Sequence, residues 1–246
     1  MNKLRPCIII PCYNHGRELS QYLPLVAEMG VDIIVVNDGS NAEESALITQ
    51  ACRKSAVRVI QSGVNQGKWA AVLSGMQAAQ EAGYTHALQC DADGQHNPCS
   101  IPEIISKAES LPEHVIVGQP QYGDDAPSAR LYGRRITHFF VQLETAGACR
   151  LDAMCGFRMY PIAPVVELIR RYGISPGMAG DIEMLVRIYW SGIPVTSIPV
   201  EVCYPEGGRS NFRMLRDNLI ISWCHTCLCT AALLHPWRLV KARRQR

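Results

Sequence analysis

The chain of 246 residues lacks several features that would assign it to a class at once. It contains no internal repeat, low-complexity tract or flexible linker, which argues against a repeat array or a string of tethered modules. No secretory signal is evident, because residues 1–6 are polar and the apolar run that follows is only as long as a strand. We therefore expect a cytoplasmic protein in a reducing compartment.

Charged residues are sparse, at 19% of the chain, and the net charge is only +2. The final segment is basic and contains no acid; its charged residues are Arg238, Lys241, Arg243, Arg244 and Arg246. The remainder of the chain is therefore net negative. This argues against a nucleic-acid binder, which would carry a basic face on its folded body. The basic tail favours an anionic membrane surface instead.

The chain has eleven cysteines, an odd number, and several lie inside apolar runs as buried free thiols do. Cys224, His225, Cys227 and Cys229 resemble part of a zinc site. However, no second ligand pair with finger-like spacing stands beside them. Because the segment is also apolar, we predict packed thiols there rather than a zinc site.

Hydrophobic residues make up 48% of the chain, enough to bury the core of one large domain or two small ones. In the first half, apolar runs alternate with helical patterns. Strands are predicted at residues 5–12, 31–36, 57–61 and 85–90, and helices at 17–29, 43–54 and 67–82. Pro24 should kink or interrupt the first helix. This alternation predicts an α/β fold with a mostly parallel sheet.

The second half is less regular. Helices are predicted at residues 101–110, 131–147, 164–172 and 180–190, strands at 114–118 and 154–160, a loop at 119–128 and extended chain at 194–204. Residues 218–237 carry no formal charge and are long enough to cross a bilayer, but polar residues dilute them. Trp223 and Trp237 suit a membrane interface. A surface-bound helix, a packed helix and a spanning helix all remain open.

Polar clusters follow three of the predicted strands, at residues 13–16, 37–40 and 91–95. In parallel α/β sheets, ligands bind beyond the carboxyl ends of the strands. In the third cluster, Asp91, Asp93 and Gln95 occupy alternate positions and can direct three oxygens toward one point. Mg²⁺ or Mn²⁺ would accept such ligands and share them with substrate phosphates. The alternative is an acidic turn.

Seven motifs in order carry a resemblance to a known family. They are IIIPCYNHGREL, IIVVNDGS, NQGKWAA, CDADGQH, CGFRMYP, GDIEMLVRIYWSG and GGRSNFR. Over about residues 5–213 the chain resembles the inverting glycosyltransferases of family 2, most of all the branch containing dolichyl- and polyprenyl-phosphate sugar synthases. The resemblance implies a GT-A fold over residues 1–213, a nucleotide-sugar donor and one divalent metal, Mg²⁺ or Mn²⁺. Residues 214–246 would add an apolar helix and basic tail, either within the same domain or associating with a membrane.

The resemblance also assigns roles on the donor side. The donor-binding positions are Pro11, Tyr13, Asp38, Lys68, Asp91, Ala92, Asp93 and Arg209. Asp91, Asp93 and Gln95 match the metal motif, and the segment around Lys68 is not a Walker loop, because its glycine spacing is missing. Arg209, with Arg213, would bind the diphosphate through its guanidinium group. His15 stands where the synthases commonly carry an acid, which leaves the base specificity open.

On the acceptor side, the matching positions are Asp152, Gly156, Phe157, Arg158 and Glu183. Asp181 matches the aspartate of the family's ED motif, which deprotonates the acceptor, but Gly180 replaces the preceding glutamate. A sugar hydroxyl needs such a general base. A lipid phosphate is already anionic near neutral pH and does not. Three roles for Asp181 therefore remain open: general base, helix cap and positioning of the acceptor.

The resemblance thus implies a metal-dependent inverting glycosyltransferase. It would act on a nucleotide-diphosphate sugar and a lipid-linked or glycan acceptor, at the cytoplasmic face of a membrane. A non-catalytic nucleotide-sugar-binding scaffold and a sugar-1-phosphate nucleotidyltransferase are the alternatives. The oligomeric state is not indicated.

Overall fold

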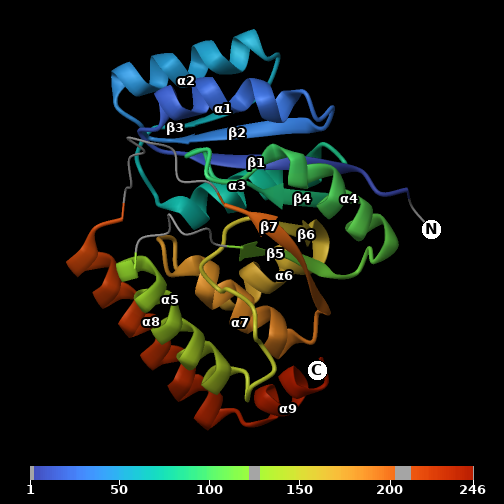
Figure 1. The fold of residues 1–246 in the computed structure, drawn as a ribbon, viewed down its shortest axis with the longest axis vertical. Coiled ribbons are helices and arrows are strands. Elements are labelled where there is room, and N and C mark those ends of the chain that lie inside the picture. The colour runs from blue at the N-terminus through green and yellow to red at the C-terminus, as the bar shows by residue number, and fades with distance from the viewer. Residues whose placement is uncertain (1–2, 122–127, 203–211, 246) are drawn as a thin grey trace.

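The computed structural model describes residues 3–121, 128–202 and 212–245 as a seven-stranded sheet between two layers of helices (Figure 1). The strands are β1 (Pro6–Cys12), β2 (Asp32–Asp38), β3 (Arg58–Ser62), β4 (His86–Gln89), β5 (Val115–Gln121), β6 (Arg158–Pro161) and β7 (Val195–Glu201). Their order across the sheet is β3-β2-β1-β4-β6-β5-β7. Only β6 runs antiparallel to its neighbours, so the predicted mostly parallel sheet is confirmed.

Nine α-helices are described. They are α1 (Gly16–Ala27), α2 (Ala42–Lys54), α3 (Lys68–Glu81), α4 (Ile101–Ser110), α5 (Ser128–Glu144), α6 (Ile162–Tyr172), α7 (Gly180–Ser191), α8 (Met214–Leu234) and α9 (Trp237–Arg243). A short 3₁₀ turn, Pro98–Ser100, precedes α4.

Three predicted elements differ from the structure. Of the kink or interruption predicted at Pro24, the interruption is wrong: α1 continues to Ala27, because Leu23 and Val26 on either side of Pro24 are fully buried. The strand predicted at residues 154–160 shrinks to β6, since Arg158 donates back to the Ala153 carbonyl (2.7 Å) and holds residues 153–157 as a loop. The loop predicted at 119–128 is partly strand, because β5 pairs with β7 as far as Gln121.

Two hydrophobic cores lie on the two faces of the sheet, because alternate strand residues point to opposite sides. Ile8 and Ile10 of β1 belong to the core shared with α1, α2 and α4. Cys7 and Ile9 belong to the core shared with α3, α6, α7 and α8. The sheet is therefore buried on both faces, as parallel sheets are.

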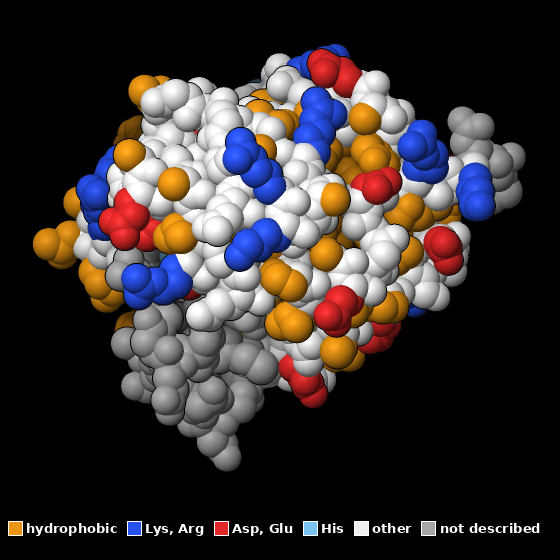
Figure 2. Space-filling view, turned by 90° about the horizontal axis from the view of Figure 1, so that it is seen from above, with side chains coloured by type: hydrophobic (Ala, Val, Ile, Leu, Met, Phe, Trp, Pro, Cys, Tyr) orange, Lys and Arg blue, Asp and Glu red, His pale blue; other side chains and the backbone are white. Residues whose placement is uncertain are grey.

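The uncharged segment predicted at residues 218–237 forms most of α8, and α9 turns back against α7. α8 lies beside α5 at the edge of the molecule (Figure 1). It is long and apolar enough to cross a membrane by length and composition alone, and 28% of its apolar stretch is buried against the protein. On the face of the molecule shown in Figure 2, basic and acidic side chains are interspersed.

Candidate active site

The three polar clusters meet at one edge of the sheet, as the strand order requires. The backbone N–H of Asn14, after β1, donates to Ser40 Oγ after β2 (2.9 Å). Asp38, at the end of β2, accepts the backbone N–H groups of Gln66 and Gly67 (2.9 and 2.8 Å). Asp38 thereby anchors the loop that leads into α3 and places Lys68 at the end of β4.

Lys68 bridges two carboxylates at the centre of this edge. Its ammonium nitrogen lies 2.9 Å from Asp91 Oδ1, after β4, and 2.8 Å from Asp181 Oδ2, in the first turn of α7. Burial acts to lower the pKa of Lys68, but the two carboxylates outweigh it and raise that pKa above its ordinary value. Lys68 is therefore held as a cation between two anions.

Asp181 is almost fully buried, and both of its carboxylate oxygens accept hydrogen bonds. Oδ1 accepts from Trp69 Nε1 (2.9 Å) and Gln89 Nε2 (3.0 Å), while Oδ2 accepts from Lys68. Arg158 donates to the backbone carbonyl of Asp181 (2.8 Å). Asp181 therefore does not cap its own helix; its side chain ties α7 to α3 and β4.

The pKa of Asp181 reflects these contacts. Burial acts to raise the pKa, but the charges of Lys68 and Arg158 and the hydrogen bonds from Lys68 and Gln89 hold it below its ordinary value. The carboxylate is stabilised in its ionised form by the protein's own groups.

Asp93 lies in the opposite electrostatic environment. Burial, and then the neighbouring charge of Asp91, raise the pKa of Asp93 above its ordinary value. Its Oδ1 accepts the backbone N–H of Gln95 (3.0 Å). A divalent cation at Asp93 would offset both the burial of this carboxylate and the neighbouring charge of Asp91. Within residues 3–121, 128–202 and 212–245, no group of three or more His, Cys, Asp or Glu side chains is arranged to hold a metal.

Lys68, Asp91 and Asp181 form a charged cluster, and Gly156 lies directly against it. A Cβ atom at this position would be 2.7 Å from Lys68 Nζ, 2.8 Å from Asp91 Oδ2 and 3.0 Å from Gln89 Nε2. Its neighbours Phe157 and Arg158 are fully buried, and the Phe157 ring lies 5.1 Å from that of His96. Of these three predicted acceptor-side residues, only Gly156 lies against the side chains of Lys68 and Asp91. Arg158 supports the cluster through its hydrogen bond to the Asp181 carbonyl.

The replacement of glutamate by Gly180 has a steric reason. A Cβ atom at residue 180 would lie 2.1 Å from Trp69 Cδ1 and 2.5 Å from the Ser175 carbonyl oxygen. The indole ring occupies the space that a side chain at residue 180 would need. The same ring donates the hydrogen bond that fixes Asp181.

The other predicted residues lie around this centre or away from it. Pro11 is buried in β1 and Ala92 is buried beside Asp91, while Tyr13 follows β1 directly. Asp152 pairs with Arg134 and accepts the N–H of Met154 (2.8 Å). Glu183 points away from Asp181, accepting from Ser175 Oγ (2.7 Å) and Arg187 Nε (2.8 Å).

Arg209 and most of the loop predicted to carry it lie outside the described residues; Arg213 directly precedes α8.

Sequence reasoning missed Trp69 and Gln89, the two donors to Asp181 Oδ1. Both carried a signal. Gln89 is a polar side chain in an otherwise apolar strand, where an unpaired amide would be costly. Trp69 is adjacent to Lys68 at the start of α3, so any group near one is near the other.

Residues 7–164, more than half of the chain, match the family described as Glycosyl transferase family 2, and the chain belongs to this family. Membership supports a glycosyl-transfer function. Among curated proteins, the chain is 28% identical to an uncharacterized protein of Methanocaldococcus jannaschii over 80% of this chain and 88% of that one. It is 24% identical to the undecaprenyl-phosphate 4-deoxy-4-formamido-L-arabinose transferase of Salmonella choleraesuis, over 92% and 68%.

Two solved structures show the same fold. One is glucosyl-3-phosphoglycerate synthase from Mycobacterium tuberculosis in complex with Mn²⁺, uridine diphosphate and glucosyl-3-phosphoglycerate, with 14% identity, a TM-score of 0.68, and coverage of 93% of this chain and 81% of that one. The other is the mannosyltransferase PcManGT from Pyrobaculum calidifontis in complex with GDP-Man and Mn²⁺, with 14% identity, a TM-score of 0.58, and coverage of 100% and 74%. The protein therefore has the GT-A fold that its sequence predicted.

Proposed function

We propose that this protein transfers a sugar, with inversion, from a nucleotide-diphosphate sugar to the phosphate of a polyprenyl lipid. The observation that carries the proposal is the bridge from Asp91 through Lys68 to Asp181 at the ligand-binding edge of the sheet. The similarity to undecaprenyl-phosphate sugar transferases supports the choice of acceptor.

The donor diphosphate would bind at the end of β4. Asp91, Asp93 and Gln95 would hold a Mg²⁺ or Mn²⁺ ion, which when bound offsets negative charge on the departing diphosphate. The raised pKa of Asp93 supports a cation there, and two structures of the same fold contain Mn²⁺ with nucleotide ligands. Arg209 and Arg213 remain predicted diphosphate ligands, while Pro11, Tyr13 and Asp38 remain predicted for the nucleoside.

The contacts of Asp181 favour an acceptor that is already anionic. A general base must offer a lone pair and gain from protonation, whereas Asp181 has both oxygens engaged and a lowered pKa. A phosphate oxygen needs no deprotonation near neutral pH. It would attack the anomeric carbon from the face opposite the diphosphate, forming the new C–O bond as the bond to the leaving oxygen breaks. Lys68, held by Asp181, would attract the incoming phosphate.

A membrane location follows from such an acceptor. Exposed apolar side chains on α8, including Leu215 and Trp223, together with the basic tail, support peripheral contact with an anionic bilayer at its cytoplasmic face. In this proposal residues 1–213 form the catalytic unit and residues 214–246 the membrane-associating segment.

The test measures sugar transfer by the purified full chain with Mn²⁺, a panel of nucleotide-diphosphate sugars and detergent-dispersed polyprenyl phosphate. We expect one donor to give sugar-phosphate-lipid product. Asp93→Ala should abolish the product while leaving the fold intact by circular dichroism. The matched control is Glu109→Ala, which removes an exposed acid at the end of α4 and should retain full activity.

Three other outcomes would redirect the assignment. Transfer to a polyprenol or glycan hydroxyl but not to the phosphate would overturn the acceptor. Donor binding by thermal shift without turnover would indicate the non-catalytic scaffold. Pyrophosphate release from a nucleoside triphosphate and a sugar 1-phosphate would indicate the nucleotidyltransferase.

A further inference from the structure

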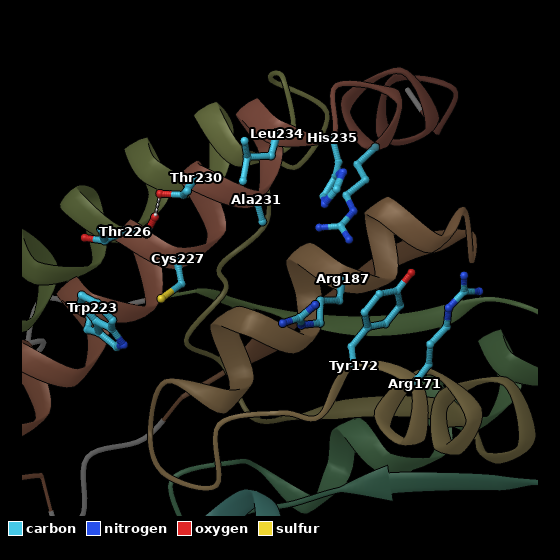
Figure 3. Close-up of a pocket in the computed structure, with 11 residues that line it drawn as sticks. Arg171, Tyr172, Arg187, Trp223, Thr226, Cys227, Thr230, Ala231, Leu234 and His235 are labelled. Carbon is cyan, nitrogen blue, oxygen red and sulfur yellow. Dashed lines mark hydrogen bonds between the residues drawn. The ribbon is translucent and has the colours of Figure 1, made fainter.

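A concave site lies away from the charged cluster, between α8 and the C-terminal halves of α6 and α7 (Figure 3). It is a groove of about 560 Å³ that α9 closes at one end. Arg187, which lines it, is six residues beyond Asp181 on α7, a rise of about 9 Å along the helix. The groove is therefore a separate site on the far part of the same helix.

Three guanidinium groups gather on one side of this groove. The central carbons of Arg171, Arg187 and Arg238 lie 5.3, 5.1 and 5.6 Å from the centre of the Tyr172 ring. Each is close enough for a cation–π contact, which leaves its N–H donors available. The ring thus brings together three positive groups that would otherwise repel one another.

Among the described residues, one acid compensates this charge. Glu183 pairs with Arg187, and its other oxygen accepts from Ser175. Arg171 and Arg238 form no ion pair with any residue that the structure describes. About two positive charges in the groove are therefore left for a ligand. Guanidinium groups in this number match the several oxygens of a phosphate.

α8 forms the opposite wall of the groove (Figure 3), and most of the residues that it contributes are apolar. Trp223 and Leu234 line it and are 69% and 68% exposed. The hydroxyls of Thr226 and Thr230 between them donate to carbonyls of their own helix (2.9 and 2.8 Å). A ligand that fills the groove must carry an anionic head on the arginine side and an apolar body on the α8 side.

We propose that this groove binds the phosphate headgroup of an anionic phospholipid, with the acyl chains lying along the exposed face of α8. A soluble phosphate would satisfy the arginines but leave the apolar wall in water. A phospholipid satisfies both sides at once. The site would fix the orientation of the protein on the membrane independently of the transfer reaction.

Vesicle co-sedimentation of the full chain tests this proposal. We expect vesicles of phosphatidylcholine with phosphatidylglycerol to bind the protein, and pure phosphatidylcholine to bind it weakly. The double variant Arg171→Gln/Arg238→Gln should bind the mixed vesicles at least tenfold more weakly. The charge-matched control Arg243→Gln/Arg244→Gln removes two positive charges outside the groove lining and should lose severalfold less.

Equal losses in the two double variants would overturn the proposal, because they would show diffuse attraction rather than a site. Inorganic phosphate that displaces the protein from vesicles and raises its melting temperature would assign the groove to a soluble phosphate instead. The thermal shift produced by nucleotide and Mn²⁺ should be the same in all of these variants. If only the groove variant lost this thermal shift, the groove would not be independent of the transfer site. If no protein showed the shift, including the wild type, the result would count against the proposed function only.

Discussion

At residue 156 the difference between glycine and alanine is one methyl group, and that group would lie inside the charged cluster. Its three nearest atoms are the ends of the Lys68, Asp91 and Gln89 side chains, which can move while the backbone stays in place. We therefore expect Gly156→Ala to fold with a melting temperature close to that of the wild type. Displacing Lys68 and Asp91 by about 1 Å should reduce the transfer rate about a hundredfold.

The matched control is Gly177→Ala, because a Cβ atom at Gly177 meets nothing within 4 Å. Steady-state transfer assays and melting curves on both variants separate activity from stability. If Gly156→Ala transferred sugar at the wild-type rate, the cluster around Lys68 would not be the reacting centre.

The residues of the cluster were predictable to different degrees. Asp91 and Asp93 follow an apolar strand, a pattern that sequence alone reveals. The pairing of Lys68 with Asp181 spans 113 residues, and no local pattern indicates it. The resemblance placed both near the substrate but gave each a separate role. Their mutual contact depends on how α3 and α7 pack, which the sequence does not state.

At the scale of elements, α8 is fastened to α5 by a buried polar contact. His225 Nδ1 lies 2.7 Å from Glu144 Oε1, and the ring stacks on Phe140 at 4.9 Å. The Glu144 carbonyl accepts from Trp190 Nε1 of α7 (2.8 Å), so three helices meet at one residue. α8 is thus held to the protein on one side and exposes apolar residues on the other.

We expect His225→Ala to lower the free energy of unfolding by about 3 kcal/mol, because it leaves the Glu144 carboxylate buried without its nearest partner. Denaturant unfolding measures the loss, and hydrogen exchange should show faster opening of α8. Ser222→Ala, which changes an exposed side chain on the same helix, should cost less than about 0.5 kcal/mol. An unchanged unfolding free energy in His225→Ala would show that α8 does not depend on this contact.

Most helices and strands were predictable because they repeat a simple pattern. The residues around Pro24 show the limit of local reasoning, since burial of the neighbouring side chains outweighs the proline in α1. The partner of α8 was not predictable either. The buried face of α8 carries Cys224 and His225. Only the position of Glu144 at the end of α5 explains why the polar His225 lies on that face.

At the scale of the whole molecule, the two carboxylates of the site contribute to folding stability with opposite signs. The pKa of Asp181 is lowered in the folded protein, so its stabilising contribution is present above the unfolded-state pKa of about 3.9 and is lost as the pH falls through the folded value. The pKa of Asp93 is raised, so its contribution is full below about pH 3.9 and is lost as the pH rises through the folded value. Ionisation of Asp93 in the folded protein therefore lowers the stability of the fold.

Replacing Asp93 should therefore stabilise the protein without metal. We expect Asp93→Asn in EDTA to melt at a higher temperature than the wild type at pH 7, with the difference vanishing below about pH 4, where Asp93 is protonated in both folded and unfolded chains. Asp181→Asn should instead melt at a lower temperature at pH 7. Mn²⁺ should raise the melting temperature of the wild type more than that of Asp93→Asn, since a ligand bound only by the folded state stabilises it. A lower melting temperature for Asp93→Asn at pH 7 would mean that burial and the charge of Asp91 do not disfavour the ionised Asp93, and the main physical reason for placing a cation there would be lost.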